Sequence, residues 1–377
     1  MIGDLLVYNV LRTLLFATLL LCGKTISISK KKGMITVCSV CIIVTFSLIE
    51  GLRWDRGPDY YNNYLLLTTN DLSIVKSEPL FNTIIGIFKK SLLPYWCAFI
   101  FFSFLYIYSF SKVVKEFPKA AVWALPIMFL VTVDAHENLI RQFIAISFFL
   151  FAYYFYIKQK KTPMLLCLIC IFNIHLSGLF VIAIFLFLIS FKIERYIRKP
   201  SLLVGIYLIL HFFWDTSYLN PITNYLNTID LGDVTMQGYI DNTDRWFTNE
   251  GSISALQGKS GAASFMTIFF RLVTNCTIIY WGFKAIKIDE RLRIPYWFTF
   301  FAFIIHIIGG DIEIYRRFAW WLYYFMPLVL GAIWYLVPMN NKIRMTLMLI
   351  IAFSYTYSFI MRYTTIPYSG FAFVWDR

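Results

Sequence analysis

Long runs of hydrophobic residues, broken by short charged stretches, dominate the pattern of this chain of 377 residues. An α-helix needs about 20 apolar residues to cross the hydrocarbon core of a bilayer. Runs of that kind lie near residues 3–22, 34–50, 92–110, 120–134, 140–157, 201–216, 263–283, 294–310, 317–337 and 343–361. The pattern predicts an all-α polytopic membrane protein that forms a single integral-membrane domain over residues 1–377.

One further apolar run, residues 164–190, fits either one tilted span or a pair of short segments. The charges between the runs decide between the two, because short loops rich in Lys and Arg stay in the cytoplasm. Basic clusters occupy residues 24–32, 112–119, 158–161, 192–199, 284–293 and 342–344. Together these clusters hold 20 of the 34 Lys and Arg but only four acids.

All six clusters lie on one side of the membrane only if an even number of crossings separates each neighbouring pair. A single span at 164–190 would break this rule, and two short segments at 164–175 and 177–190 restore it. We therefore predict about twelve membrane segments with both termini outside. Segments as short as these two suit a tilted or re-entrant pair.

The outer segments in this topology are rich in Trp, Tyr and Asn and carry charges of both signs. Two of them, residues 51–91 and 217–262, are long enough to form walls of a site or a lid. The second fits a mobile loop equally well. Residues 78–90 are mildly amphipathic and too short to span, which is typical of an interfacial helix that starts at Pro79.

Composition agrees with the membrane class, since 59% of the residues are hydrophobic and 15% are charged. The net charge of +13 is better explained by anchoring charge in cytoplasmic loops than by nucleic acid. Cys167 and Cys170 have CxxC spacing, but they lie inside an apolar run, which indicates helix packing rather than metal binding. The sequence has no HExxH motif and no nucleotide-binding Gly-rich loop, so we expect no metal and no cofactor.

Charged residues recur at the predicted outer ends of separate apolar runs, where unpaired charge is costly and a shared cavity is expected. The groups are Arg53, Asp55, Arg56 and Asp59; Asp134, His136, Glu137 and Arg141; Asn173 and His175; Asp311, Glu313, Arg316 and Arg317; and Glu78. Their cations are all arginines, whose guanidinium fork binds phosphate oxygens in pairs. This favours a lipid-linked phosphate or diphosphate ligand, with salt bridges to nearby carboxylates as the alternative role.

Five short motifs follow one another between residues 50 and 330. They are Arg53-x-x-x-Gly57-x-Asp59-Tyr60-x-x-Tyr64, Glu78-Pro79-Leu80-Phe81-Asn82, Arg141-Gln142-x-x-Ala145, Asn173-Ile174-His175-Leu176-Ser177 and Tyr315-Arg316-Arg317. In order and spacing they resemble the EpsG-type polysaccharide polymerases, within the broader Wzy or O-antigen polymerase group. The family's Phe-His-x-Ser-Ala keeps its His and Ser here, while Gly57-Pro58-Asp59 replaces the commoner Gly-Thr-Asp.

The resemblance implies a GT-C-like fold and a metal-independent glycosyltransferase whose site faces the exterior of the bacterial inner membrane. Such an enzyme moves a growing glycan from undecaprenyl diphosphate onto a sugar hydroxyl of an incoming lipid-linked repeat unit. The implied partners are these donor and acceptor lipids, the membrane lipids and a chain-length co-polymerase. No nucleic acid is implied.

In that reaction arginines would stabilise the departing diphosphate, and a carboxylate or an imidazole would take the acceptor's proton. The candidate diphosphate ligands are Arg53, Arg56, Arg141, Arg316 and Arg317, of which the last two point apart on a helix. The candidate catalytic residues are, in order, Asp59, His175 and Glu137, although His175 also fits a packing role. The candidate sugar-binding residues are Trp54, Tyr60, Tyr64, Glu78 and Asn173, although the aromatic ones also fit an interfacial belt.

Two other functions stay open at this stage. A surface-glycan ligase or acyltransferase would use a similar outer site of arginine and histidine. A transporter of lipid-linked oligosaccharides would place charge near the bilayer midplane and show internal repeats. The charges here favour helix ends and no repeat is evident, which argues against transport.

Overall fold

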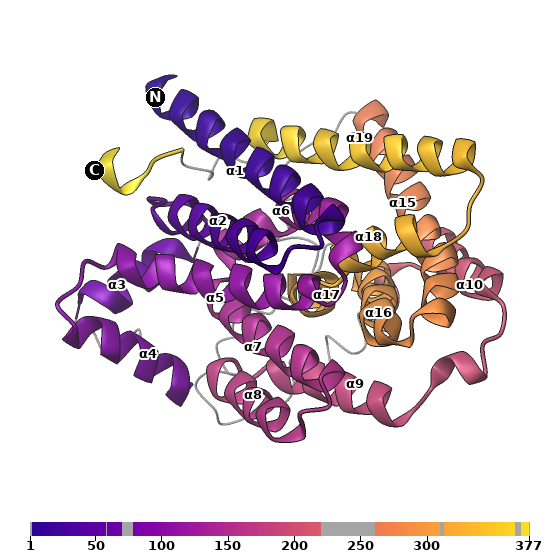
Figure 1. Ribbon diagram of the computed structural model, residues 1–377, viewed down its shortest axis with the longest axis horizontal. Helices are drawn as coiled ribbons and strands as arrows, with labels where there is room; N and C mark the ends of the chain where they lie inside the picture. The colour runs from indigo at the N-terminus through magenta and orange to yellow at the C-terminus, as the bar shows by residue number, and fades with distance from the viewer. Residues whose placement is uncertain are drawn as a thin grey trace. The chain divides into compact units, whose positions relative to one another are not determined.

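The computed structural model describes residues 2–57, 59–69, 78–219, 261–309, 313–365 and 371–376. These residues are almost entirely helical, and their β-structure includes an isolated bridge between Arg53 and Phe373. The α-helices are α1 (Ile2–Ile28), α2 (Lys32–Gly51), α3 (Tyr60–Thr68), α4 (Pro79–Lys90), α5 (Trp96–Lys115), α6 (Ala121–Asn138), α7 (Ile140–Ile157), α8 (Lys161–Ile174), α9 (Gly178–Ser190), α10 (Pro200–Phe213), α15 (Gly261–Ile288), α16 (Arg293–Gly309), α17 (Glu313–Tyr323), α18 (Met326–Leu336) and α19 (Asn341–Thr365) (Figure 1). The predicted all-α class is confirmed.

Seven helices in the described ranges are long and apolar enough to cross a membrane. They cover Leu5–Ile28, Lys32–Gly51, Trp96–Lys115, Ile140–Ile157, Met266–Ile288, Glu290–Gly309 and Asn341–Ile360. A pair bent by 40°, α17 and α18, makes an eighth if both halves form one span. Shorter apolar helices cover Pro118–Val133, Lys161–Ile174, Gly178–Ser190 and Pro200–Phe213. The chain is thus a multi-pass membrane protein, and the total of about twelve segments stays a prediction.

The apolar run at 164–190 is two helices. Helix α8 ends at Ile174, His175 is extended with φ −155° and ψ 114°, and α9 begins at Gly178. The predicted break is confirmed, while the crossing or re-entrant nature of the pair stays a prediction. The predicted helix at 78–90 is also present as α4, with Pro79 in its first turn, where a missing N–H has no cost.

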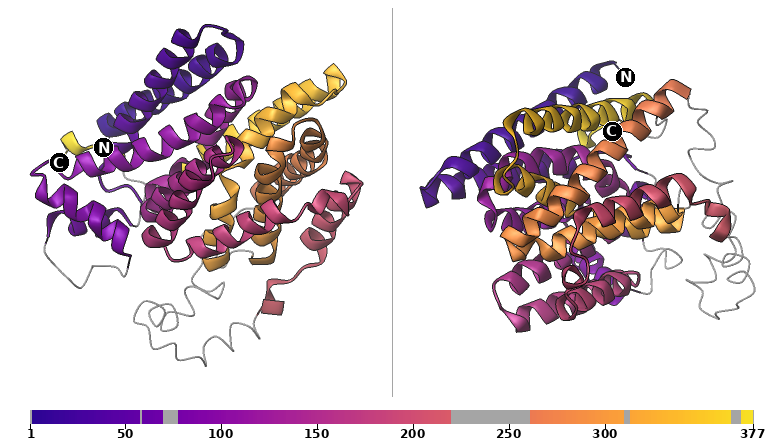
Figure 2. Two further views of the ribbon diagram at one scale, coloured as in Figure 1. Left: turned by 60° about the horizontal axis from the view of Figure 1, so that its bottom comes forward. Right: turned by 90° about the vertical axis from the view of Figure 1, so that its right-hand side faces the viewer.

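The chain divides into two compact units. The first holds residues 1–184, 330–335 and 359–377, and the second holds residues 185–329 and 336–358. In the first unit α1 packs on α2 and α6, α2 packs on α5, α5 on α7 and α7 on α8, a succession that can be followed in Figure 2. In the second unit α10 packs on α15 and α16, and α16 packs on α17. Most of the predicted outer loop at 217–262 lies outside the described residues.

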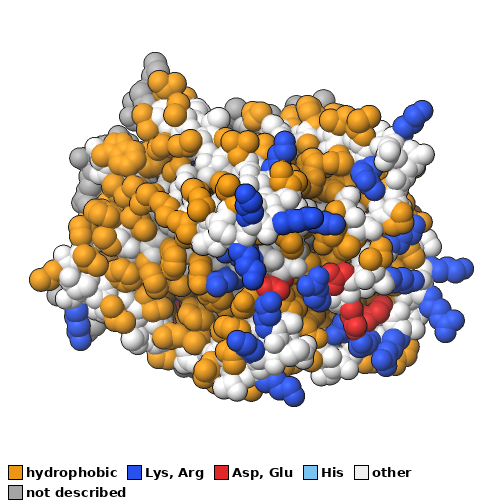
Figure 3. Space-filling view, in the orientation of Figure 1, with side chains coloured by type: hydrophobic (Ala, Val, Ile, Leu, Met, Phe, Trp, Pro, Cys, Tyr) orange, Lys and Arg blue, Asp and Glu red, His pale blue; other side chains and the backbone are white. Residues whose placement is uncertain are grey.

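The surface is rich in apolar side chains that would be costly to expose to water. Leu6 and Leu21 of α1, and Leu349 and Phe353 of α19, are all more than half exposed. Figure 3 shows one face on which hydrophobic side chains cover broad areas and Lys and Arg gather outside them. Such a surface suits lipid, because acyl chains are as apolar as the side chains themselves.

Candidate active site

Five charged side chains of the first unit form a buried charge cluster, made of Arg12, Glu50, Arg53, Arg56 and Glu137. Arg12 Nη1 donates to Glu50 Oε1 at 2.5 Å, and its Nη2 donates to Glu137 Oε1. Arg56 Nη1 lies 3.2 Å from the same Glu137 oxygen. Arg53 donates to the backbone carbonyl of Glu50 and, at 3.5 Å, to that of Glu137. Glu137 therefore joins α1, α6 and the loop that follows α2.

The close approach of that loop to the end of α6 explains a glycine of the first motif. Gly57 has φ +89°, a conformation that side chains rarely adopt. A Cβ at this position would lie 2.9 Å from the carbonyl oxygen of Glu137 and 3.0 Å from Cα of Asn138. The next residue described, Asp59, donates its backbone N–H to Asn138 Oδ1 at 3.3 Å. Gly57 is thus required where the loop contacts the last turn of α6.

Aromatic faces surround the three guanidinium groups. Arg53 lies over Phe99 at 5.4 Å, and Arg12 lies over Tyr8 at 5.0 Å. Arg56 lies over Phe373 at 4.6 Å and over Tyr8 at 5.1 Å. Cation–π attraction is stronger in such desolvated surroundings than at a surface. It offsets part of the cost of burying three cations against two carboxylates.

The C-terminal residues 372–374 pack against the buried charge cluster. Trp54 N–H donates to the carbonyl of Ala372, and Val374 N–H donates to the carbonyl of Leu52, each at 2.9 Å. These bonds form the isolated bridge and place Phe373, which is fully buried, against Arg56. The predicted outer tail is therefore part of the fold around the cluster.

The electrostatics favour a structural role for the cluster. Glu137 lies beyond the apolar part of α6, which ends at Val133. Burial alone would raise the pKa of Glu137, but the guanidinium groups of Arg12, Arg56 and Arg53 lower it to about 2. A carboxylate held this strongly in its charged form is a poor proton acceptor near neutral pH. Arg56 is only 1% exposed and Arg53 equally so, so neither guanidinium is open to a ligand in this structure.

A second set of polar residues, the outer ion-pair group, consists of Glu78, Arg141, His175 and Ser177. Arg141 Nη1 donates to Glu78 Oε2 at 2.5 Å. His175 Nδ1 lies 3.8 Å from Glu78 Oε1 and 3.1 Å from Ser177 Oγ. Three helix ends bring these residues together, because Glu78 precedes α4, Arg141 lies in the first turn of α7 and His175 follows α8.

The outer ion-pair group is more accessible than the buried cluster. The side chain of Arg141 is 26% exposed and that of His175 is 17% exposed. Among the residues described, Arg141 makes its hydrogen bond through Nη1, so the other guanidinium donors stay available to a ligand. Ser177 and Glu78 both approach Nδ1 of His175. A Ser-His-acid triad needs opposite ring nitrogens, so this group is not such a triad.

The remaining predicted residues of the first unit pack locally. The side chains of Trp54, Tyr60, Tyr64 and Tyr95 form an aromatic cluster, with Trp54 5.7 Å from Tyr60 and 5.3 Å from Tyr64. The hydroxyl of Tyr60 donates to the carbonyl of Arg53 at 3.1 Å. Burial raises the pKa of Tyr60, which keeps this donor protonated. Trp54 and Tyr64 stay partly exposed, and Tyr60 does not.

Asp59 and Asn173 occupy helix ends. Asp59 precedes α3 without a capping bond from its side chain, and its carbonyl accepts from Asn63 Nδ2 at 2.6 Å. Its half-buried carboxylate has no partner among the described residues. Asn173 Nδ2 donates to the carbonyl of Ile169 within α8 at 2.8 Å. The predicted roles of both residues stay predictions.

Arg316 and Arg317 belong to the second unit, in the first turns of α17, and both are half-buried. Their predicted role toward the diphosphate stays a prediction. Arg12 and Glu50 were not predicted, although they complete the buried cluster. A signal for them exists, since Arg12 interrupts the apolar run 3–22 and Glu50 is the one charge in the run 34–50, and charges in a membrane span are expected to be paired.

The fold and these two polar groups define a class, a multi-pass membrane protein with ionic groups at helix ends. The sequence model of the EpsG family matches residues 36–373, which includes all of the motifs, and the chain belongs to that family. The suspected family is thus confirmed, and membership makes the chain a membrane protein of polysaccharide biosynthesis. No curated protein and no solved structure matches the chain.

Proposed function

We propose that the protein is a polysaccharide polymerase that joins undecaprenyl-diphosphate-linked repeat units. The outer ion-pair group carries this proposal, because it combines an accessible guanidinium, a carboxylate and an imidazole at three neighbouring helix ends. All of its residues lie within the segment that matches the EpsG family. Family membership supports glycan chemistry, and the group supplies the residue types that glycosyl transfer from a diphosphate requires.

Arg141 is the proposed ligand of the donor's diphosphate. Among the described residues its guanidinium bonds to a carboxylate through Nη1, and the planar fork of an arginine fits two phosphate oxygens at once. Glu78 holds it from one side, and Phe81 lies 5.8 Å from it on another. A preorganised cation of this kind stabilises the negative charge that develops as the diphosphate departs.

His175 is the proposed general base. The acceptor's hydroxyl oxygen forms a bond to the anomeric carbon while the bond from that carbon to the diphosphate oxygen breaks, and the electron pair leaves with the diphosphate. The hydroxyl proton moves to the imidazole, which accepts protons near neutral pH. We place His175 ahead of Asp59 because it lies beside Glu78, the residue that holds Arg141. We do not propose Glu137 as the base, because it is buried and already paired with Arg12 and Arg56.

The remaining predicted residues take supporting roles in this proposal. Arg53, Arg56 and Glu137 position the loop and helix ends around the outer ion-pair group, and they do not touch substrate. Trp54 and Tyr64 are partly exposed and offer faces on which a sugar ring can stack. The site faces the exterior of the inner membrane in a GT-C-like arrangement, and the partners are two glycan lipids and a chain-length co-polymerase.

The reaction can be tested with purified protein in sealed lipid vesicles. Undecaprenyl-diphosphate-linked repeat units are added without metal or nucleotide, and the products are resolved as a glycan ladder. Successive additions support the polymerase. A single transfer to a different acceptor would indicate a ligase, and movement of the lipid across the membrane without bond formation would indicate a transporter.

Variants test the assigned residues. Arg141→Lys keeps the charge but loses the planar fork, and we expect it to lower polymer formation by at least about tenfold. His175→Asn should lower it further than Asp59→Asn, and the reverse order would return the base to Asp59. The control is Arg291→Gln, which removes an arginine that pairs with Asp289 in a basic loop. A ladder of wild-type length from Arg141→Lys would refute the diphosphate role.

A further inference from the structure

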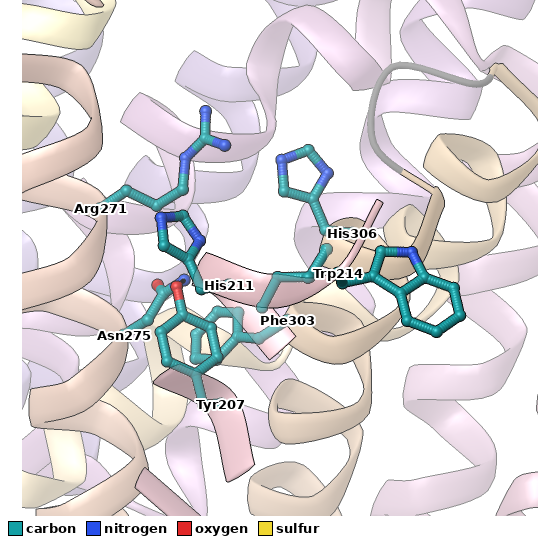
Figure 4. A pocket seen from close by; sticks show the side chains of 8 residues that line it. Tyr207, His211, Trp214, Arg271, Asn275, Phe303 and His306 are labelled. Carbon is teal, nitrogen blue, oxygen red and sulfur yellow. Dashed lines mark hydrogen bonds between the residues drawn. The ribbon is translucent and has the colours of Figure 1, made fainter. Parts of the chain in front are cut away.

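A cavity of about 180 Å³ lies inside the second unit, between α10, α15 and α16. It is slightly larger than an engineered cavity of about 150 Å³ that holds benzene. Its polar lining consists of Tyr207, His211, Trp214, Arg271, Asn275 and His306 (Figure 4). No role has been given to these residues by the motifs or by the outer ion-pair group.

Three of these lining residues are ionisable and lie within apolar helices, which requires an explanation. Arg271 lies within the span Met266–Ile288 and His306 within the span Glu290–Gly309, while His211 lies in the short apolar helix α10. Placing such groups at membrane depth costs free energy, so they are rare and usually mark a ligand site or a relay. Three of them around one cavity indicate that the cavity binds something polar.

The charges around the cavity favour an anion. In the described part of the chain, no Asp or Glu lines the cavity and no carboxylate pairs with Arg271. A guanidinium has five donors and no acceptor, and each imidazole adds a donor. In Figure 4 the guanidinium of Arg271 and the rings of His211 and His306 lie on one side, above Tyr207. A cation would be repelled by Arg271, so the lining favours a negatively charged ligand.

The buried wall of the cavity is already ordered. Asn275 Nδ2 donates to the Tyr207 hydroxyl at 2.9 Å, and both residues are buried. Tyr207 has no exposed surface, so this hydrogen bond orders the wall and does not contact a ligand. The ring of His211 stacks on Tyr207 at 6.0 Å. The wall therefore fixes the position of the His211 ring in the cavity that Arg271 also lines.

We propose that this pocket of the second unit is a phosphate-binding site. Arg271 holds the anion through paired N–H donors, His211 adds an imidazole donor, and the buried pair of Tyr207 and Asn275 orders the wall behind them. The phosphate belongs either to a lipid headgroup or to a free anion, since the recognising chemistry is shared. A polymerase must hold two lipid diphosphates, and assigning this pocket to one of them rests on the proposed function, whereas the phosphate site itself does not.

The test uses the full-length protein in nanodiscs of phosphatidylcholine, with radiolabelled inorganic pyrophosphate as the probe. Arg271→Gln removes the cation from an exposed position and should weaken binding at least about tenfold. Arg291→Gln removes an arginine elsewhere in the second unit and should change binding by less than about twofold. If Arg271→Gln does not fold, Arg271→Lys replaces it and should also weaken binding, because the fork is lost. Unchanged affinity in the folded variant overturns the proposal.

Competition identifies the source of the phosphate. A polyprenyl diphosphate in the nanodisc should displace the labelled pyrophosphate at least about tenfold more effectively than free pyrophosphate if the site takes a lipid headgroup. Equal potency indicates a free anion, and either result supports the site when it depends on Arg271. Binding of pyrophosphate that is lost in Arg141→Gln but kept in Arg271→Gln would overturn the proposed site at Arg271. Binding that depends on Arg271 in a protein that makes no polymer would reject the proposed function alone.

Discussion

Two matched substitutions, Glu137→Gln and Glu78→Gln, separate the structural charges from the chemical ones. Both remove a carboxylate that accepts a hydrogen bond from an arginine, and both keep the shape of the side chain. They differ in the cations left behind. Glu137→Gln leaves Arg12 and Arg56, whose side chains are 4% and 1% exposed, whereas Glu78→Gln leaves Arg141, which is 26% exposed.

The exposure of those cations determines how much stability each substitution removes. At the 3.2 Å that separates Arg56 Nη1 from Glu137, two unit charges attract by about 5 kcal/mol at an effective dielectric constant of about 20. Removing one partner of a buried ion pair costs about 3–5 kcal/mol, because the other stays buried and uncompensated. Arg141 can turn toward solvent or headgroups, so Glu78→Gln should cost about 1 kcal/mol.

Thermal unfolding in detergent, followed by tryptophan fluorescence, measures the difference. We expect Glu137→Gln to lower the apparent Tm by about 5 °C or more and Glu78→Gln by about 1 °C. Polymer formation per folded molecule should show the opposite order, with Glu78→Gln at least about tenfold slower because Arg141 and His175 lose their shared carboxylate. Equal Tm losses, or a greater loss of activity in Glu137→Gln, would refute the division between the two groups.

Three further predictions concern the fold around the buried cluster. Gly57→Ala should destabilise the protein by about 1–3 kcal/mol, because φ is +89° and the new Cβ meets the Glu137 carbonyl, while Gly86→Ala in open space should not destabilise it. Removing residues 371–377 should lower the Tm by exposing Arg56 and deleting the buried Phe373, and Trp375→Ala, at an exposed position, should lower it less in the same melting assay. The lowered pKa of Glu137 stabilises the fold fully above the ordinary value of 4.5, and this contribution is lost as pH falls toward about 2. The Tm gap between wild type and Glu137→Gln should thus narrow below about pH 4, and a gap that widens in acid would contradict this sign.

Local features of the chain could be predicted because their causes are local. The break at His175 follows from the charge alternation of the flanking loops, and α4 follows from a proline at the start of an amphipathic stretch. Both rest on residues within a few turns of the feature. The same reasoning predicted that Glu78, Arg141 and His175 lie at the ends of helices. It did not predict the distances between these residues.

The buried cluster could not be predicted because its partners are distant in the chain. Arg12 is 38 residues from Glu50 and 125 from Glu137, and the bridge from Arg53 reaches Phe373 near the C-terminus. Hydrophobic periodicity places helices in the membrane without fixing which faces meet. The motif arginines were therefore assigned to a ligand, while the structure pairs Arg53 and Arg56 with protein groups.

The first motif acts on the site through the turn between α6 and α7. Arg53 and Gly57 contact the carbonyl of Glu137, and the backbone of Asp59 binds the side chain of Asn138. Asn138 ends α6, and Arg141 lies in the first turn of α7, three residues later. A loop that fixes Asn138 therefore fixes the start of α7 and with it the direction of Arg141. The motif can thus be essential to the proposed glycosyl transfer without contact to substrate, because its buried arginines hold in place the arginine that remains accessible.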